Sequence, residues 1–174
     1  MPRSHTDSLV VTRRFIRLLI GVNYALGFGI AALLIASLVA GGWVMRALGV
    51  EPSATSGTTI VGMRLIMVLG ITAVPFSYVV LTRLLAIVDT VTAGDPFVQV
   101  NAARLQTIAR AVLGLELTHL LVGAVAAVAF SAGQPVDIGW RFSLTRWLAV
   151  LLLFVLARVF EQGARMREDL AGTV

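Results

Sequence analysis

The sequence predicts an all-α integral membrane protein: a four-helix transmembrane bundle with a cytoplasmic helical hairpin extending between helices two and three. A single membrane domain is expected to cover residues 1–174. Of these residues, 58% are hydrophobic and only 13% are charged, whereas about a quarter of the residues of a soluble domain are charged. Four long apolar stretches follow one another, and about 20 apolar residues suffice to cross a bilayer as a helix. Lipid offers no hydrogen bonds to a bare backbone, so these stretches must be helical.

The first span is expected at about 16–45, because no charged residue lies between Leu18 and Met45. Arg13 and Arg14, which precede it, loosely resemble a twin-arginine export signal. The apolar run that follows is much longer than the roughly 7–15 residues of a signal-peptide core. We therefore expect the first helix to remain in the mature protein.

The second span, about 60–83, is expected to continue as a helix beyond the membrane. Residues 84–92 keep apolar side chains at the spacing that one buried helical stripe requires. Gly94 suits the position just after a helix C-terminus, and Pro96 lies just beyond it. Asn101 is a good N-cap for the next helix. The two helices should project from the membrane as a hairpin with arms of about ten residues, or ~15 Å.

The third span, about 108–131, and the fourth, about 143–162, each contain three ionisable residues. The chain has 14 basic residues, all of them arginine, and they are unevenly distributed between the ends of the four spans. Ten lie before the first span, between the second and third, or close to the C-terminus. The four on the opposite side are Arg46, Arg64, Arg141 and Arg146. This imbalance predicts a protein of the bacterial inner membrane with both termini and the central loop in the cytoplasm.

Glu116, inside the third span, is the strongest functional hint, because a charged carboxylate in lipid costs about 2.5 kcal/mol or more. Counting residues from the arginines that flank the spans places the side chains of Asn23, Tyr78 and Glu116 in one layer ~9 Å inside the cytoplasmic boundary. Arg158 approaches this layer along the fourth span and could bind the carboxylate. The candidates for the layer are Glu116, His119, Asn23, Tyr78 and Arg158. Two interpretations stay open: polar contacts between helices, or a site for a ligand or proton.

The spacing of Glu116 and His119 is also found in metal-binding helical bundles, which need a second such pair and further carboxylates. No other span offers them, and the chain has no cysteine. We therefore expect neither a metal nor a cofactor. A convergent set of nucleophile and base is also missing from the sequence, so a non-enzymatic protein is favoured over an integral membrane enzyme.

Two segments carry a family resemblance: Gly94 to Phe97 followed by Asn101 to Leu105, and the C-terminal Gly163 to Val174. Together they resemble the bacterial membrane protein family called domain of unknown function 2975. The resemblance extends over nearly the whole chain and implies four spans, a cytoplasmic Gly-Asp-Pro-Phe loop and no known activity. Members are often encoded beside a small helix-turn-helix regulator, so the resemblance implies a membrane-associated regulatory unit with such a cytoplasmic regulator as partner.

The function we expect is that of a regulatory or interaction protein whose cytoplasmic surface binds a soluble protein rather than nucleic acid. The docking candidates are Asp95, Pro96, Asn101, Arg165, Arg167 and Asp169. The alternative is a small transporter or ligand-binding membrane protein that uses the layer around Glu116. Small-residue pairs such as Gly27 with Ala31 permit close helix contacts, so a homo-oligomer also stays open.

Overall fold

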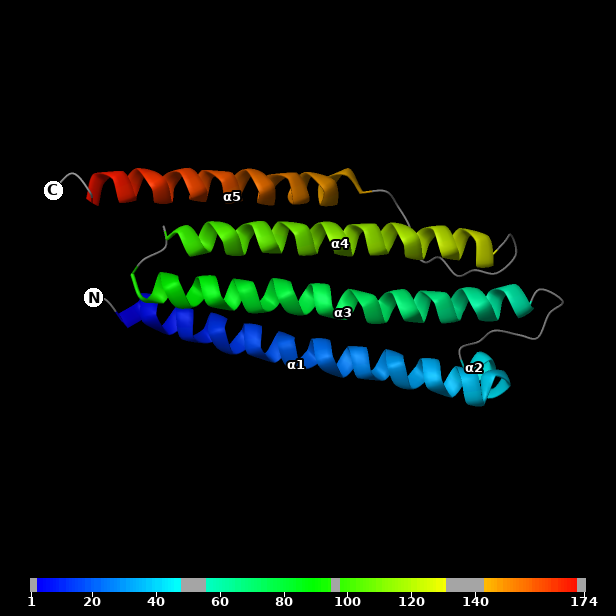
Figure 1. Ribbon diagram of the computed structural model, residues 1–174. Coiled ribbons are helices and arrows are strands. Elements are labelled where there is room, and N and C mark those ends of the chain that lie inside the picture. The colour runs from blue at the N-terminus through cyan, green and yellow to red at the C-terminus, as the bar shows by residue number, and fades with distance from the viewer. Residues whose placement is uncertain (1–2, 48–55, 95–97, 131–142, 172–174) are drawn as a thin grey trace.

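The computed structural model describes residues 3–47, 56–94, 98–130 and 143–171, and the described chain is helical (Figure 1). The prediction of an all-α protein is therefore confirmed for this part of the chain. The described residues form four long helices and one short helix. They are α1 (Arg3–Val39), α2 (Gly41–Ala47), α3 (Ser56–Thr92), α4 (Gln99–Ala129) and α5 (Leu144–Ala171).

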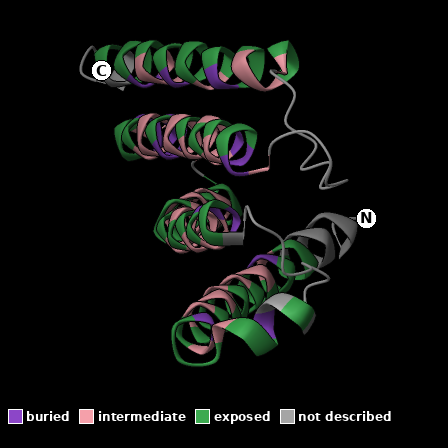
Figure 2. Ribbon diagram, turned by 90° about the vertical axis from the view of Figure 1, so that its right-hand side faces the viewer, coloured by how far each residue is buried: buried purple, intermediate pink, exposed green. Residues whose placement is uncertain are grey.

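The four long helices lie side by side in a row, so the bundle is open (Figures 1 and 2). α3 and α4 form a central antiparallel pair, α1 packs against α3, and α5 packs against α4. The start of α1, the turn after α3 and the end of α5 lie at the same end of the row. We call this end of the molecule the turn end.

Three of the helices are long and apolar enough to cross a membrane. These segments are Val10–Val39, Gly57–Thr92 and Gln99–Ala129. Their surfaces are strongly apolar and open: Phe28 is 81% exposed and Val128 is 80% exposed. Water-soluble proteins rarely expose contiguous apolar surface of this kind, whereas lipid covers it at no cost. The chain is therefore a helical membrane protein. The predicted fourth span lies in α5, which is not among these three segments.

Glycines allow α3 and α4 to approach closely at two levels. A Cβ atom added to Gly62 would lie 2.1 Å from the Cβ of Ala129, and one added to Gly114 would lie 2.7 Å from the Phe76 ring. A side chain in either place would force Ala129 or the Phe76 ring to shift. The two helices are therefore in close contact at both levels, and beside Gly62 the Thr59 hydroxyl also donates to the Ala129 carbonyl oxygen at 3.3 Å.

The best-buried hydrophobic cluster lies between α4 and α5. It consists of Leu105, Ile108 and Ala157, which are at most 8% exposed. Partly buried side chains of α3, α4 and α5 surround it: Val80, Ile87, Val112, Leu153 and Phe160. This cluster fixes the position of α5 along α4 and lies toward the turn end.

The two predicted helix ends next to the turn have different outcomes. Gly94 has a φ of +86°, so the prediction of glycine in the left-handed conformation after α3 is confirmed. The prediction that Asn101 is an N-cap is wrong. α4 begins at Gln99 with Val98 at the N-cap, three residues before the predicted cap, and no side chain caps it. Asn101 lies inside the first turn of α4, where its side chain forms hydrogen bonds across the hairpin.

Candidate functional site

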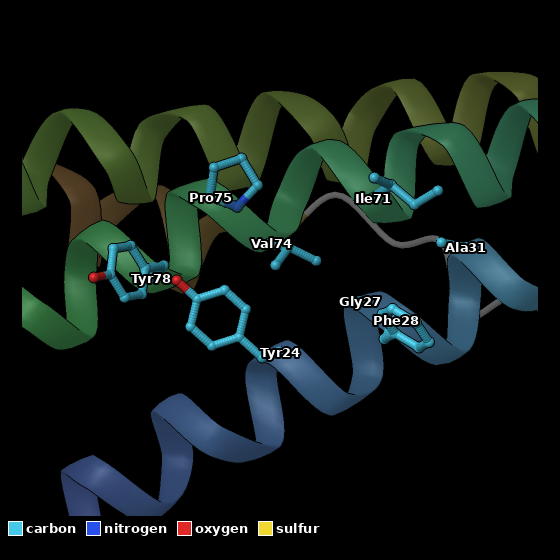
Figure 3. A pocket seen from close by; sticks show the side chains of 8 residues that line it. All are labelled: Tyr24, Gly27, Phe28, Ala31, Ile71, Val74, Pro75 and Tyr78. Atoms are coloured by element: carbon cyan, nitrogen blue, oxygen red, sulfur yellow. The ribbon is translucent and has the colours of Figure 1, made fainter.

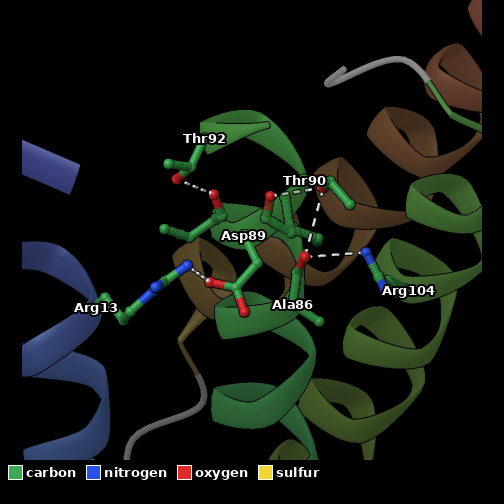
Figure 4. A network of polar contacts seen from close by, with 8 residues as sticks. Arg13, Ala86, Asp89, Thr90, Thr92 and Arg104 are labelled. Carbon is green, nitrogen blue, oxygen red and sulfur yellow. Dashed lines mark hydrogen bonds and ion pairs between the residues drawn. The ribbon is translucent and has the colours of Figure 1, made fainter. Parts of the chain in front are cut away.

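Asn101 is fully buried and joins α3 to α4 at the turn end. Its side-chain amide nitrogen donates to the hydroxyl of Thr90 at 2.8 Å. The guanidinium of Arg104 donates to the Asn101 side-chain oxygen at 2.9 Å. The same guanidinium nitrogen donates to the carbonyl oxygen of Ala86, also at 2.9 Å (Figure 4). One amide thus connects a hydroxyl on α3 to a cation on α4.

The hydroxyl of Thr90 completes this network. Its oxygen lies 2.7 Å from the Ile87 carbonyl oxygen and accepts the Asn101 amide. A hydroxyl has a single proton to donate, so donation to Ile87 and acceptance from Asn101 satisfy both bonds at once. Fully satisfied buried polar networks of this kind hold neighbouring helices in one arrangement.

Arg13 and Asp89 form an ion pair that joins the start of α1 to the end of α3 (Figure 4). Both side chains are partly exposed, at 39% and 47%, so the pair contributes little stability by itself. The pair instead fixes the register between α1 and α3, that is, which residues of these two antiparallel helices face each other.

The polar layer predicted around Glu116 has a different composition in the structure. Glu116 lies 3.9 Å from Arg146, at the start of α5, and its side chain is only 14% exposed. Arg158 instead pairs with Glu161 on its own helix at 3.2 Å. The expected pairing of Glu116 with Arg158 is wrong. The position of α5 along α4 brings Arg146, and not Arg158, to the level of Glu116.

The other members of the predicted layer lie apart from Glu116. Asn23 donates from its side chain to the carbonyl oxygen of Val74 at 3.2 Å and so joins α1 to α3. Tyr78 packs against Tyr24, with ring centroids 5.4 Å apart. His119, one turn after Glu116, has a buried Nε2 atom without a hydrogen-bond partner. Asn23 and Tyr78 therefore contact α1–α3 partners, whereas Glu116 pairs with α5 and His119 lies beside it on α4.

The predicted docking residues are only partly within the described chain. Arg165 pairs with Glu161 at 2.7 Å, and Arg167 and Asp169 are exposed on α5 at the turn end. Asp95 and Pro96 lie outside the described residues. Asn101, which was expected to mark the surface, is instead part of the packing between α3 and α4.

Four arginines from the four long helices lie at nearly the same level. Arg13 faces Asp89 and Tyr24 faces Tyr78, which places Arg17 level with residues 84–85, next to Arg83. The contacts of Arg104 with Ala86 and of Gly114 with Phe76 place Arg110 level with residue 80. Arg158 directly follows Ala157, which packs with Leu105 and Ile108 of α4, so Arg158 lies at about the level of these two residues. The four residues therefore fall within a band ~9 Å deep; we call Arg17, Arg83, Arg110 and Arg158 the arginine layer.

A second polar contact marks the opposite end of the apolar region. Arg64 of α3 donates to both the side-chain and the backbone oxygen of Ser37, at the end of α1. Between Arg64 and Arg83, α3 carries no charged residue over a rise of ~28 Å. This matches the ~30 Å of a hydrocarbon core. The pairing of Arg64 with Ser37 was not foreseen, because it depends on the register between α1 and α3.

Two apolar grooves were also not foreseen. One lies between α1 and α3 and includes Gly27 and Val74 among its lining residues (Figure 3). The other lies between α3 and α4 and includes Gly62 and Val125. Their volumes are about 410 and 390 Å³. Such spaces arise where small residues of two helices meet, and sequence periodicity alone does not locate them.

Among the described residues, no three His, Asp or Glu side chains gather as a metal site would require.

A family model described as "Protein of unknown function (DUF2975)" matches residues 61–174. The chain belongs to the DUF2975 family. The resemblance inferred from the Gly-Asp-Pro-Phe loop and the C-terminal segment is thereby confirmed. The match begins inside α3 and includes α4 and α5, whereas α1 precedes it. No curated protein and no solved structure matches the chain. The DUF2975 description gives no activity.

Proposed function

We propose that this DUF2975 protein is a small, non-enzymatic protein of the bacterial inner membrane that binds a soluble regulatory protein at its turn end. In this proposal the turn end faces the cytoplasm, because arginines are concentrated on the cytoplasmic side of inner-membrane proteins. The arginine layer then marks the inner boundary of the lipid, and Arg64 marks the outer one. Both chain termini are cytoplasmic in this orientation.

One observation carries the proposal: all four long helices continue well past the arginine layer, α1 by ~21 Å from Arg17 back to Arg3. α3 extends ~14 Å from Arg83 to Thr92, and α4 extends ~16 Å from Arg110 back to Gln99. α5 extends ~20 Å beyond Arg158. Helices that served only to span lipid could end at the arginine layer, so this extension favours a role outside the membrane.

The described residues of the extension are also well packed. Asn101, Ala102 and Ala164 are at most 3% exposed there, whereas the most apolar stretches of α1 and α3 have no buried residues. A rigid, prepacked surface loses little conformational entropy on binding. Charged side chains of α5, among them Arg167 and Asp169, lie exposed at this end and provide polar contacts for a partner.

We further propose that α5 is the fourth membrane helix. Its central face exposes Leu151, Leu152 and Val155, each more than 50% exposed, as a lipid-facing surface would. From Arg158 back to Leu144 the helix rises ~21 Å. This is shorter than a full hydrocarbon core of ~30 Å, and the start of α5 reaches about the level of Glu116, which pairs with Arg146.

Site-specific photocrosslinking in intact cells tests the partner proposal. A photoreactive residue at Gln99, which is exposed at the turn end, should crosslink to a soluble protein. The same residue at Val128, exposed at the opposite end, should not. Deletion of residues 165–174 should weaken the Gln99 adduct while membrane insertion stays normal. The family resemblance suggests that the adduct is a small helix-turn-helix regulator. Identical adducts at both positions, or none at either, would contradict the proposal.

A second candidate function is transport or binding of a ligand at the level of Glu116. The observations that favour it are the pairing of Glu116 with Arg146 and the unpartnered Nε2 atom of His119, both in the apolar region. Ionisable groups at this depth commonly mark proton or substrate paths. Proton flux into proteoliposomes that Glu116→Gln abolishes and Glu161→Gln leaves unchanged would favour this candidate over the first.

A further inference from the structure

The groove between α1 and α3 begins close to the arginine layer and runs into the apolar region. α1 contributes Gly27 and Ala31, and α3 contributes Ile71, Val74 and Pro75 (Figure 3). Its volume is about 410 Å³, and almost every atom that lines it is apolar. The space exists because Gly27 has no side chain: a Cβ atom there would lie 2.9 Å from the Val74 side chain.

The end of the groove nearer the turn end is formed by two aromatic side chains. Tyr24 and Tyr78 pack there with their rings tilted by 53°. Tyrosine rings favour the boundary between lipid tails and headgroups, where the ring is in an apolar environment and the hydroxyl is hydrated. The groove therefore runs from the headgroup level toward the centre of the membrane.

Arg17 lies at the headgroup level above this groove. It precedes Tyr24 by seven residues, and Tyr24 precedes Ala31 by seven, so all three lie on one stripe of α1. Arg17 is exposed. Within the described chain no acidic side chain pairs with Arg17, Arg83 or Arg110, so the arginine layer carries an uncompensated positive charge beside the groove.

We propose that the α1–α3 groove and Arg17 bind one anionic phospholipid, with the headgroup phosphate at Arg17 and an acyl chain in the groove. The guanidinium matches a phosphate in charge and in hydrogen-bond geometry. The apolar lining suits a hydrocarbon chain and offers almost no polar group to a water-soluble ligand. This inference depends on the membrane-embedded fold and is independent of any cytoplasmic partner.

Lipid titration of the purified full-length protein in a non-ionic detergent tests this site. Phosphatidylglycerol and phosphatidylcholine with identical acyl chains are compared by native mass spectrometry and by the thermal midpoint of unfolding. The wild-type protein should prefer phosphatidylglycerol, and Arg17→Gln should weaken that lipid about fivefold, since one basic residue near an anionic lipid contributes roughly that factor. The matched control Arg14→Gln, which is exposed and lies almost one turn farther from the groove, should keep most of the preference.

A second pair of variants tests the groove itself. Ala31→Trp fills the groove and should weaken both lipids, whereas Ala32→Trp, on the exposed side of α1, should bind like the wild type. If Ala31→Trp does not fold, Ala31→Leu against Ala32→Leu makes the same comparison with a smaller side chain. Soluble glycerol phosphate serves as a headgroup without chains and should neither bind nor compete.

Four results would overturn the proposal. Equal binding of both lipids by the wild type would remove the role of charge. An equal loss in Arg14→Gln and Arg17→Gln would indicate a diffuse electrostatic effect. Full binding by Ala31→Trp or its leucine counterpart would show that no acyl chain occupies the groove. Competition by glycerol phosphate would indicate a phosphate site that does not involve a lipid.

Discussion

At the scale of single residues, Asn101 shows how a polar side chain fixes the geometry of a hairpin. It is fully buried and bonded both to Thr90 and to Arg104. Removal of its amide would leave the guanidinium without one of its acceptors and the Thr90 hydroxyl without a donor. Buried polar groups that lose a partner cost more than the bond itself contributed.

Asn101→Ala should therefore lower the free energy of unfolding by about 1–3 kcal/mol. Denaturant titration of the purified protein in detergent, followed by circular dichroism, measures the change. Gln99→Ala is the matched control, because Gln99 is exposed in the same first turn of α4. An equal effect of the two substitutions would show that the hydrogen bonds of Asn101 do not hold the hairpin.

The pair of Glu116 and Arg146 can be tested by a double-mutant cycle. Glu116→Ala and Arg146→Leu should each destabilise the protein, and the double variant should lose less than their sum, with a coupling of about 0.5–3 kcal/mol. Removal of one partner leaves the other charge uncompensated in the apolar region. Glu116→Ala combined with Arg158→Leu should be additive, because Arg158 pairs with Glu161. Coupling to Arg158 but not to Arg146 would reverse this assignment.

At the scale of the helices, the contact between α3 and α4 depends on glycine. Gly62→Ala places a Cβ atom against the Cβ of Ala129 at 2.1 Å, so one helix must move. We expect a loss of about 1–3 kcal/mol, as for other overpacked sites. Gly57→Ala, on the same helix with nothing within 4 Å, should be neutral or slightly stabilising. Thermal midpoints measured in one detergent make this comparison, and equal midpoints would show that α3 and α4 are not in contact at Gly62.

The sequence predicted the helices far better than the contacts between them. Apolar runs and arginine positions depend on local composition, so the all-helical membrane fold and the glycine after α3 follow from counting residues. The partner of Glu116 depends on how far α5 slides along α4, which buried side chains such as Ala157 decide. Asn101 was misassigned for the same reason: its type is typical of an N-cap, but its role comes from Thr90 on another helix.

At the scale of the whole molecule, the open row of helices separates two environments. The part between Arg64 and Arg83 is apolar and exposed, as lipid requires, whereas the turn end contains the hydrophobic cluster and the buried amide. Each part follows the physical chemistry of its own surroundings. The arginine layer lies between them, so the direction in which the protein crosses the membrane decides which compartment the packed end faces.

Cysteine labelling tests that direction directly, because the chain contains no cysteine and each variant would carry a single thiol. Gly57→Cys and Gln99→Cys lie at opposite ends of the α3–α4 pair, and both positions are exposed. In intact spheroplasts, a membrane-impermeant maleimide should label Gly57→Cys at once and Gln99→Cys only after permeabilisation, since arginine-rich ends stay inside. The reverse pattern would place the turn end outside and remove the basis for a cytoplasmic partner.

Met166→Cys, 62% exposed at the end of α5, should behave like Gln99→Cys, because α4 and α5 together then cross twice. Labelling of Met166→Cys from outside, with Gln99→Cys protected, would leave three crossings and separate α5 from the turn end.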